Sequence, residues 1–333
     1  MATIDELFPG ASEDGLLALR FYEENYFSIA EWILEPGKKI ILGDPADKTC
    51  RFCGKRSPEV TFEMEAHALP ECLGNKSLFT AYECDVCNGF FGRGIENDFG
   101  NWAKPQHLFG QIRGKKGVPV VKKGPGDKWR LEWNASDILE ITQSDDDPVA
   151  VVDDAAKQIT FTLSRDPYTP VAVLKAFTKM GLTLLPREEL PNFRVALAWI
   201  RNRDHSAGLV KEKEFPVLHT FVPGNAPFVK IAAVLLRRKG DDLAVPYVTF
   251  VLTYGNEVFQ TILPTPERDA AISGRKVQYP YFPNVYDLGV TPREPIGRKW
   301  VDLSGRTVVR GEKVQTRIGY GSARPRDSEP QLP

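Results

Sequence analysis

Two pairs of cysteines constrain this chain more than any other feature of its sequence. Cys50 and Cys53 form one CxxC pair, Cys84 and Cys87 form a second, and 30 residues separate the pairs. Each pair offers two thiolates on a tight turn, and four thiolates make a closed tetrahedral site for Zn²⁺. The spacing therefore predicts a structural zinc site. Cys72 stands outside both pairs, and we expect it to be a small buried residue.

Composition and the amino-terminal residues narrow the class of protein further. The chain has 333 residues, of which 42% are hydrophobic and 26% are charged, as in soluble globular proteins. These values exclude a wholly disordered chain, and the length suggests two or three domains. The first residues lack a basic stretch followed by an apolar core, and no run approaches the roughly 18 apolar residues of a membrane span. We therefore expect a cytoplasmic protein without a membrane segment.

Apolar periodicity predicts helices in the amino-terminal and central parts of the chain. Residues 12–34 carry apolar side chains mostly at helical spacing, with Ser12 as a plausible N-cap. Thr169 and Pro170 form a good helix start, because a capping side chain is followed by proline in the first turn. A second central helix is expected over residues 188–201.

Alternating stretches predict strands in the second half of the chain. Residues 129–133 and 159–163 have the period-two pattern of strands. A predicted antiparallel meander is formed by residues 228–238, 247–254 and 257–263. Gly255 and Asn256 mark its second turn.

The formal net charge of −1 is the sum of blocks of opposite sign. Residues 1–48 hold ten acidic and four basic residues, whereas residues 101–130 hold eight basic residues and one acidic residue. Residues 131–154 hold eight acidic residues and no basic one, and residues 298–326 hold eight basic and two acidic residues. A near-zero total would argue mildly against nucleic acid, but the segregated distribution permits such a partner.

The residues between and after the cysteine pairs form a recognisable pattern. Residues 65–75 read EAHALPECLGN, and residues 83–92 read ECDVCNGFFG. Together with CxxCG at residues 50–54, this block resembles the HNH endonucleases with a ββα-metal fold, in the subgroup whose active-site hairpin is braced by a four-cysteine zinc. The resemblance covers residues 50–98 and rests on order, spacing and residue type together.

The resemblance implies roles for three polar residues. The family's strand histidine is a general base that takes a proton from water, and it corresponds to His67. The asparagine between the cysteine pairs steadies the hairpin and orients that histidine, and it corresponds to Asn75. The residue after the last cysteine binds a divalent ion and corresponds to Asn88, whose carbonyl oxygen suits Mg²⁺ or Mn²⁺ better than zinc. Two kinds of metal are thus implied, a structural Zn²⁺ on sulfur and a catalytic ion on oxygen.

One departure from the family pattern leaves the catalytic metal site incomplete. Many members place Asp or His immediately before the base as a second metal ligand, and this chain has Ala66 there. Glu65 is one candidate for the missing carboxylate, because strand alternation points it to the same face as His67. Glu96 is the other candidate, and it reaches the site only if the helix after Asn88 bends or ends.

The resemblance implies a metal-dependent endonuclease that hydrolyses phosphodiester bonds. By family analogy the substrate is double-stranded DNA, and the biological setting is restriction or phage defence. Basic side chains expected to hold the nucleic-acid backbone are Arg93, Lys104, Arg113, Lys115 and Lys116. One active site cuts one strand, so a homodimer would explain duplex cleavage. The alternative, which Ala66 favours, is a non-catalytic zinc-stabilised module that binds nucleic acid or a protein partner.

The expected fold class is α+β, combining a ββα-metal nuclease domain with a carboxy-terminal α+β domain that holds the strand meander. The expected segments are an amino-terminal helical segment (1–40), the HNH nuclease domain (41–105), a basic linker (106–130), an α+β domain of unassigned role (131–297) and a basic, partly disordered tail (298–333).

Overall fold

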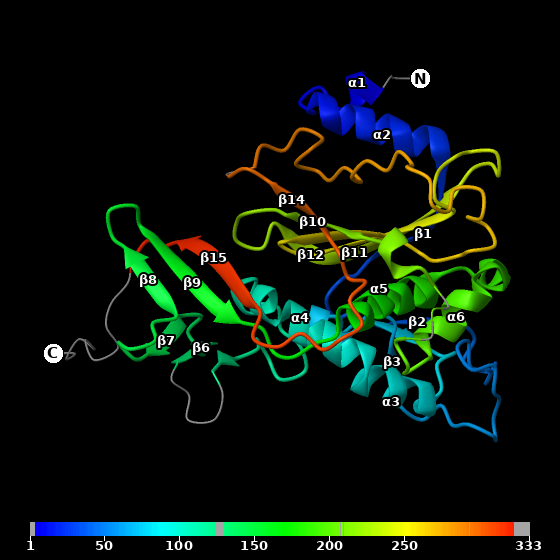
Figure 1. Ribbon diagram of the computed structural model, residues 1–333, viewed down its shortest axis with the longest axis horizontal. Coiled ribbons are helices and arrows are strands. Elements are labelled where there is room, and N and C mark those ends of the chain that lie inside the picture. Colours follow the sequence, from blue (N-terminus) through cyan, green and yellow to red (C-terminus); the bar gives the residue numbers. More distant parts are fainter. Residues whose placement is uncertain (1–3, 124–128, 207, 209, 293, 323–333) are drawn as a thin grey trace.

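The computed structural model describes residues 4–123, 129–206, 208, 210–292 and 294–322. Its main body is a layered, mixed α+β structure in which a central sheet lies between helices (Figure 1). Helix α2 (Glu13–Asn25) lies over one face, and helices α4 (Ile95–Phe109) and α5 (Pro170–Leu184) lie over the other. A lobe of short strands stands to one side of this body.

The central sheet has six strands, and every neighbouring pair in it is antiparallel. In spatial order the strands are β1 (Tyr26–Ile33), β11 (Phe228–Arg238), β12 (Val248–Gly255), β13 (Glu257–Ile262), β10 (Val217–Phe221) and β14 (Gly297–Val301). The predicted meander is confirmed as β11, β12 and β13. Its second turn falls at Gly255, whose φ of 56° is the left-handed conformation that glycine adopts readily.

The amino-terminal helix is shorter than its apolar spacing predicts. Ser12 caps α2 as expected, since its hydroxyl accepts a hydrogen bond from the backbone N–H of Gly15 at 3.0 Å. The helix ends at Asn25, however, and the chain continues as β1. The prediction of one helix over residues 12–34 was therefore wrong. Seven residues of β1 pair with β11, and this pairing outweighs an apolar spacing that fits a strand as well as a helix.

The central helix α5 begins after Thr169, as predicted, and all of its residues are buried. Its Phe177 ring lies 5.1 Å from that of Phe259 on the sheet, in an aromatic layer that Trp102 of α4 joins. The second central helix is divided, because Pro191 lacks the N–H that a continuous α-helix needs. Its parts are the 3-10 helix η2 (Arg187–Phe193) and α6 (Arg194–Ile200). Short helices also occur at α1 (Ile4–Leu7) and η3 (Glu212–Glu214).

The side lobe contains two three-stranded sheets packed around their own apolar cluster. One has β5 (Val121–Lys122), β6 (Trp129–Trp133) and β7 (Leu139–Gln143). The other has β8 (Ala150–Asp153), β9 (Gln158–Ser164) and β15 (Lys313–Gly319). The strands predicted at 129–133 and 159–163 are thus confirmed.

Part of the basic tail forms strands in two of the sheets. Residues 298–322 include most of β14 and all of β15. Each of these strands pairs with a partner far back in the chain, which composition does not reveal. The expectation of partial disorder in the tail stays a prediction. Residues 323–333 lie outside the described residues. The expected segment boundaries stay a prediction.

The cysteine block folds into a small sheet and two helices beneath α5. Its strands are β2 (Ile40–Leu42), β4 (Leu78–Thr80) and β3 (Ala66–His67), in that order; β2 runs parallel to β4 and β3 antiparallel to it. The 3-10 helix η1 (Glu71–Leu73) connects β3 to β4, and α3 (Asp85–Arg93) follows. No helix among the described residues is long and apolar enough to cross a membrane.

Candidate functional site

The four paired cysteines come together as their spacing predicts. Their sulfur atoms all lie within 4.8 Å of one another, and the Sγ atoms of Cys53 and Cys84 are 3.8 Å apart. A tetrahedral zinc with Zn–S bonds of about 2.3 Å requires S–S separations of about 3.8 Å. The donors and their geometry therefore fit a structural zinc.

The fifth cysteine takes no part in this cluster. Cys72 lies on η1, and burial raises the pKa of its thiol to about 12. It therefore stays protonated at neutral pH, and it is neither a metal ligand nor a reactive thiolate in this structure.

The first knuckle is attached to the carboxyl end of α5 through Arg51. Its guanidinium donates hydrogen bonds to the carbonyl oxygens of Leu182, Thr183 and Leu185 at 3.0, 2.7 and 2.8 Å. It also lies over the ring of Tyr82, 3.9 Å from the centroid. These carbonyls at a helix end lack helical partners, so a cation that satisfies them fixes the knuckle against the helix.

A buried cluster of three charges lies beside the four clustered cysteines. Lys179 of α5 places its ammonium 3.0 Å from Glu83 and 2.9 Å from Glu96. Burial lowers the pKa of Lys179, but the two carboxylates outweigh that effect and the net shift is upward. Burial raises the pKa of Glu83 to about 7 in spite of the adjacent ammonium. Sequence reasoning did not identify Lys179, because it lies 92 residues beyond Cys87.

His67 lies on β3, opposite Phe79 of β4, and its ring is 4.6 Å from the Phe79 ring. A quarter of its side chain, 26%, is accessible, so the imidazole can meet solvent. Burial lowers the pKa of His67 below its ordinary value, although the charges of Glu71 and Glu96 oppose this. The neutral form that a general base needs is therefore the dominant one at neutral pH.

Glu71 is a second residue near the site that sequence reasoning missed. Its carboxylate oxygen lies 3.9 Å from Nε2 of His67, and its side chain is 29% accessible. In the sequence, only its position four residues after His67, directly after Pro70, could have indicated that Glu71 lies near the histidine. Glu71 can steady a charged imidazole or supply an oxygen ligand to a cation next to it.

Asn75 holds the two strands of the hairpin together and is fully buried. Its amide nitrogen donates to the carbonyl oxygens of Leu69 and Leu78 at 2.7 and 2.9 Å. Its amide oxygen accepts from the backbone N–H groups of Ser77 and Leu78 at 3.1 and 2.9 Å. Asn75 thus acts on the hairpin that carries His67, rather than on the imidazole directly.

Asn88 and Glu96 lie on either side of a break in the helix. Asn88 is half-buried on α3, and its side chain makes no hydrogen bond to another described residue. The chain breaks at Gly94, where α3 ends and α4 begins, so Glu96 occupies the first turn of a new helix. Glu96 could approach the site only if the helix after Asn88 bends or ends, and the helix does end at this point. Its carboxylate is, however, already paired with Lys179.

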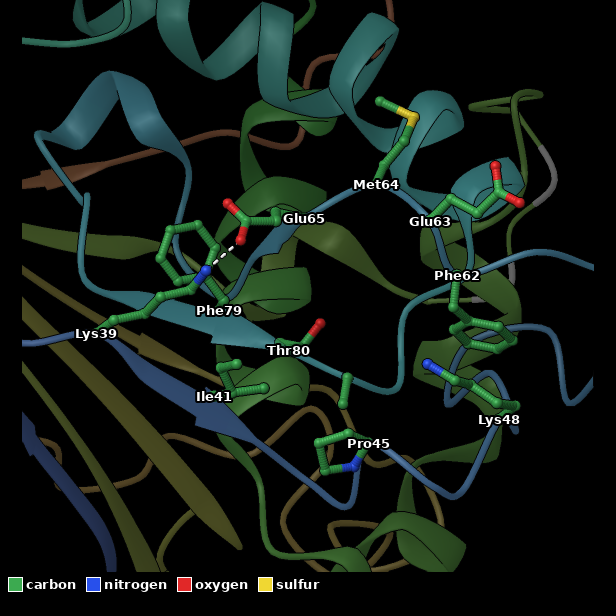
Figure 2. A pocket seen from close by; sticks show the side chains of 11 residues that line it. Lys39, Ile41, Pro45, Lys48, Phe62, Glu63, Met64, Glu65, Phe79 and Thr80 are labelled. Atoms are coloured by element: carbon green, nitrogen blue, oxygen red, sulfur yellow. Dashed lines mark hydrogen bonds and ion pairs between the residues drawn. The ribbon is translucent and has the colours of Figure 1, made fainter.

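Glu65 occupies a different, exposed position at a shallow cleft of about 170 Å³ (Figure 2). It forms an ion pair with Lys39, whose ammonium lies 4.9 Å from the centroid of the Phe79 ring. Figure 2 shows the two charged groups meeting above that ring. Glu65 and Glu96 were the two candidates for the carboxylate ligand that is missing at Ala66. Both are paired with a lysine in the structure.

The basic side chains predicted to contact nucleic acid differ in whether they already form ion pairs within the protein. Lys104 pairs with Asp166 at 2.7 Å and Arg113 with Asp137 at 2.8 Å. Lys115 and Lys116 are exposed on a turn. Arg93 is exposed at the end of α3 and has no hydrogen-bond or ion-pair partner among the described residues.

The other histidines are engaged elsewhere in the fold. His107 is buried 3.1 Å from the Tyr254 hydroxyl, and burial lowers its pKa to about 3. His219 is buried in a pair with Glu257. His205 lies beside the ammonium of Lys175.

Comparison with known proteins agrees with this arrangement. Residues 50–103 match a protein family described as HNH endonuclease. Neither the comparison with curated proteins nor that with solved structures finds a match. The matched residues contain all four clustered cysteines as well as His67. The chain therefore carries an HNH endonuclease family domain at residues 50–103, built around a four-cysteine cluster.

Proposed function

We propose that this protein is a metal-dependent endonuclease that hydrolyses phosphodiester bonds in double-stranded DNA. Membership of residues 50–103 in the HNH family implies a nucleic-acid substrate and a nuclease activity. The observation that carries the proposal is the position of His67: it lies on β3 within the matched block, is partly accessible, and faces the Glu71 carboxylate. Burial lowers the pKa of His67, which favours the neutral form. The small sheet followed by α3 would correspond to the ββα-metal arrangement of the family.

In this proposal His67 removes a proton from the water that attacks the phosphorus atom. Glu71, 3.9 Å from Nε2, stabilises the imidazolium that results. Asn75 fixes the hairpin and so keeps the histidine in position. The products would carry a 5′ phosphate and a 3′ hydroxyl.

A catalytic Mg²⁺ or Mn²⁺ fits the oxygen donors of this region. Asn88 has a side-chain amide free of hydrogen bonds to described residues, and Glu71 or Glu96, whose charges both act on His67, could supply a carboxylate. The ion would stabilise negative charge on the leaving 3′ oxygen. Glu65 is the less favoured ligand, because it is exposed and paired with Lys39.

The test is cleavage of supercoiled plasmid by wild-type protein and by the His67→Ala variant, with Mg²⁺ or Mn²⁺ and with a chelator. We expect nicking that requires the metal and is lost in His67→Ala, while zinc content and thermal unfolding stay unchanged. Full cleavage by a well-folded His67→Ala protein would refute the assignment. Replacing Glu71 or Glu96 by Gln and comparing the metal concentration for half-maximal cleavage identifies the carboxylate.

A second candidate function is a zinc-stabilised module that binds nucleic acid or a protein partner without cutting. Ala66 and the lysine pairs of Glu65 and Glu96 support it, because they leave the metal site short of free carboxylates. Binding of DNA without nicking under all metal conditions would favour this candidate.

A further inference from the structure

A cleft of about 390 Å³ lies between the HNH domain and the helical part of the chain that follows it. The junction of α3 and α4 forms one wall, through residues such as Phe90 and Arg93. The other wall comes from α5, the end of α6 and the turn after it, including Arg203 and His205. The size is within the range typical of small-ligand sites, and none of the residues on the second wall belongs to the matched family block.

Two arginines that line this cleft lack acidic partners. Neither Arg93 nor Arg203 forms a hydrogen bond or an ion pair with another described residue. Arg203 lies over the ring of Phe90, 5.1 Å from its centroid, which brings it across to the first wall. Each guanidinium carries five N–H donors and no acceptor, so the pair offers a concentrated set of donors to an oxyanion.

Asp98 is the carboxylate among the described residues that line the cleft, and it is already engaged. Asp98 accepts a hydrogen bond from the backbone N–H of Thr169, at the amino terminus of α5. It therefore caps a helix, and it makes no ion pair with either arginine.

His205 adds a third donor to the cleft. Its Nδ1 lies 3.1 Å from the ammonium of Lys175, which also donates to the carbonyl oxygen of Asn202 at 2.8 Å. Because an ammonium can only donate, Nδ1 must be the acceptor, and a neutral ring then carries its proton on Nε2. The cleft thus has donors from both walls.

We propose that this cleft binds one phosphate group of the nucleic-acid strand next to the bond that is cleaved. This rests on the proposed function. The Arg93 guanidinium folds back against Gly89, the residue directly after the predicted metal ligand Asn88, since a Cβ at Gly89 would lie 3.1 Å from its Nη1. A guanidinium donates two parallel hydrogen bonds to phosphate oxygens, so Arg93 and Arg203 together can hold one phosphate group. Arg203 is thereby a substrate-binding residue supplied from outside the HNH domain.

The experiment measures binding of a fluorescein-labelled 20-base-pair DNA duplex by anisotropy, over a range of salt concentrations and with a chelator to prevent cleavage. We compare the wild type with Arg93→Gln, Arg203→Gln, the double variant, and Arg201→Gln as control. Arg201 is exposed two residues before Arg203 and does not line the cleft. Both arginines of the cleft are exposed, so the variants are expected to fold.

We expect each cleft variant to weaken binding about tenfold and to lower the slope of log affinity against log salt by about 1. Because both arginines hold the same phosphate, the double variant should lose little more than either single variant. Arg201→Gln should bind as the wild type does.

Wild-type affinity and salt slope in Arg203→Gln would overturn the proposal. So would fully additive losses, which would mean two separate phosphates, or a wild-type protein that does not bind the duplex. Binding that depends on both arginines without any cleavage of plasmid would refute the proposed function, and with it the position next to a cleaved bond, and would leave the cleft as a phosphate-binding site.

Discussion

The ammonium of Lys179 lies 3.0 Å from the carboxylate of Glu83, and both side chains are at most 1% accessible. Glu83 directly precedes Cys84 of the four-cysteine cluster, whereas Lys179 belongs to the buried helix α5. The Lys179 ammonium also lies 5.5–5.6 Å from the rings of Phe52 and Phe91. Through this pair the HNH domain is packed into the body of the protein.

Removing one partner of this pair should destabilise the protein strongly. Lys179→Met leaves two carboxylates without their cation, one of them fully buried, and breaking a buried pair in this way costs about 3–5 kcal/mol. Urea unfolding followed by tryptophan fluorescence measures the change. Lys230→Met is the control, since its pair with Glu35 is exposed and should contribute less than about 1 kcal/mol. Equal stability of the two variants would contradict the role given to Lys179.

The cysteine cluster should hold one zinc ion per chain. Cys84→Ser removes one of four thiolates, so we expect zinc content to fall from one ion per chain to near zero, with a drop in Tm of at least about 5 °C. Inductively coupled plasma mass spectrometry and calorimetry measure these changes. Cys72→Ser should keep the zinc, because Cys72 lies outside the cluster. Zinc retained at full occupancy in Cys84→Ser would argue against the site.

The amino-acid sequence was most informative where neighbouring residues decide the structure. The CxxC spacing predicted the cluster, and Thr169 with Pro170 predicted the start of α5. Lys179 and Arg203 were not predicted, because only the folded chain brings them to the HNH domain. The strand β1 was taken for helix for the same reason, since its partner β11 lies some 200 residues away.

Cleavage should depend on the protonation of His67. A general base must be neutral, and burial lowers the pKa of His67 below the ordinary value of 6.5. The rate should therefore stay level as the pH falls from 8 to 6.5, and then drop about tenfold per pH unit below the folded pKa. Plasmid nicking at constant ionic strength measures the profile. A midpoint of the acidic limb at or above pH 6.5 would contradict this environment for the histidine.

Asn75 should matter for the stability of the hairpin and, through it, for cleavage. Asn75→Ala removes four hydrogen bonds and leaves buried backbone groups of Leu69, Ser77 and Leu78 without these partners. We expect a loss of about 2–4 kcal/mol in the free energy of unfolding. At temperatures where the variant stays folded, cleavage should also fall, because the strand that carries His67 is no longer tied to its neighbour.

Asn101→Ala provides the matched control for this prediction. The Asn101 side chain makes one hydrogen bond, to the carbonyl oxygen of Pro167, at an exposed position. Its loss should cost less than about 1 kcal/mol, and cleavage should stay at the wild-type rate. Urea unfolding and plasmid nicking, run on both variants side by side, separate the two effects. If Asn75→Ala cleaved as fast as Asn101→Ala while folded, Asn75 would stabilise the hairpin without positioning His67.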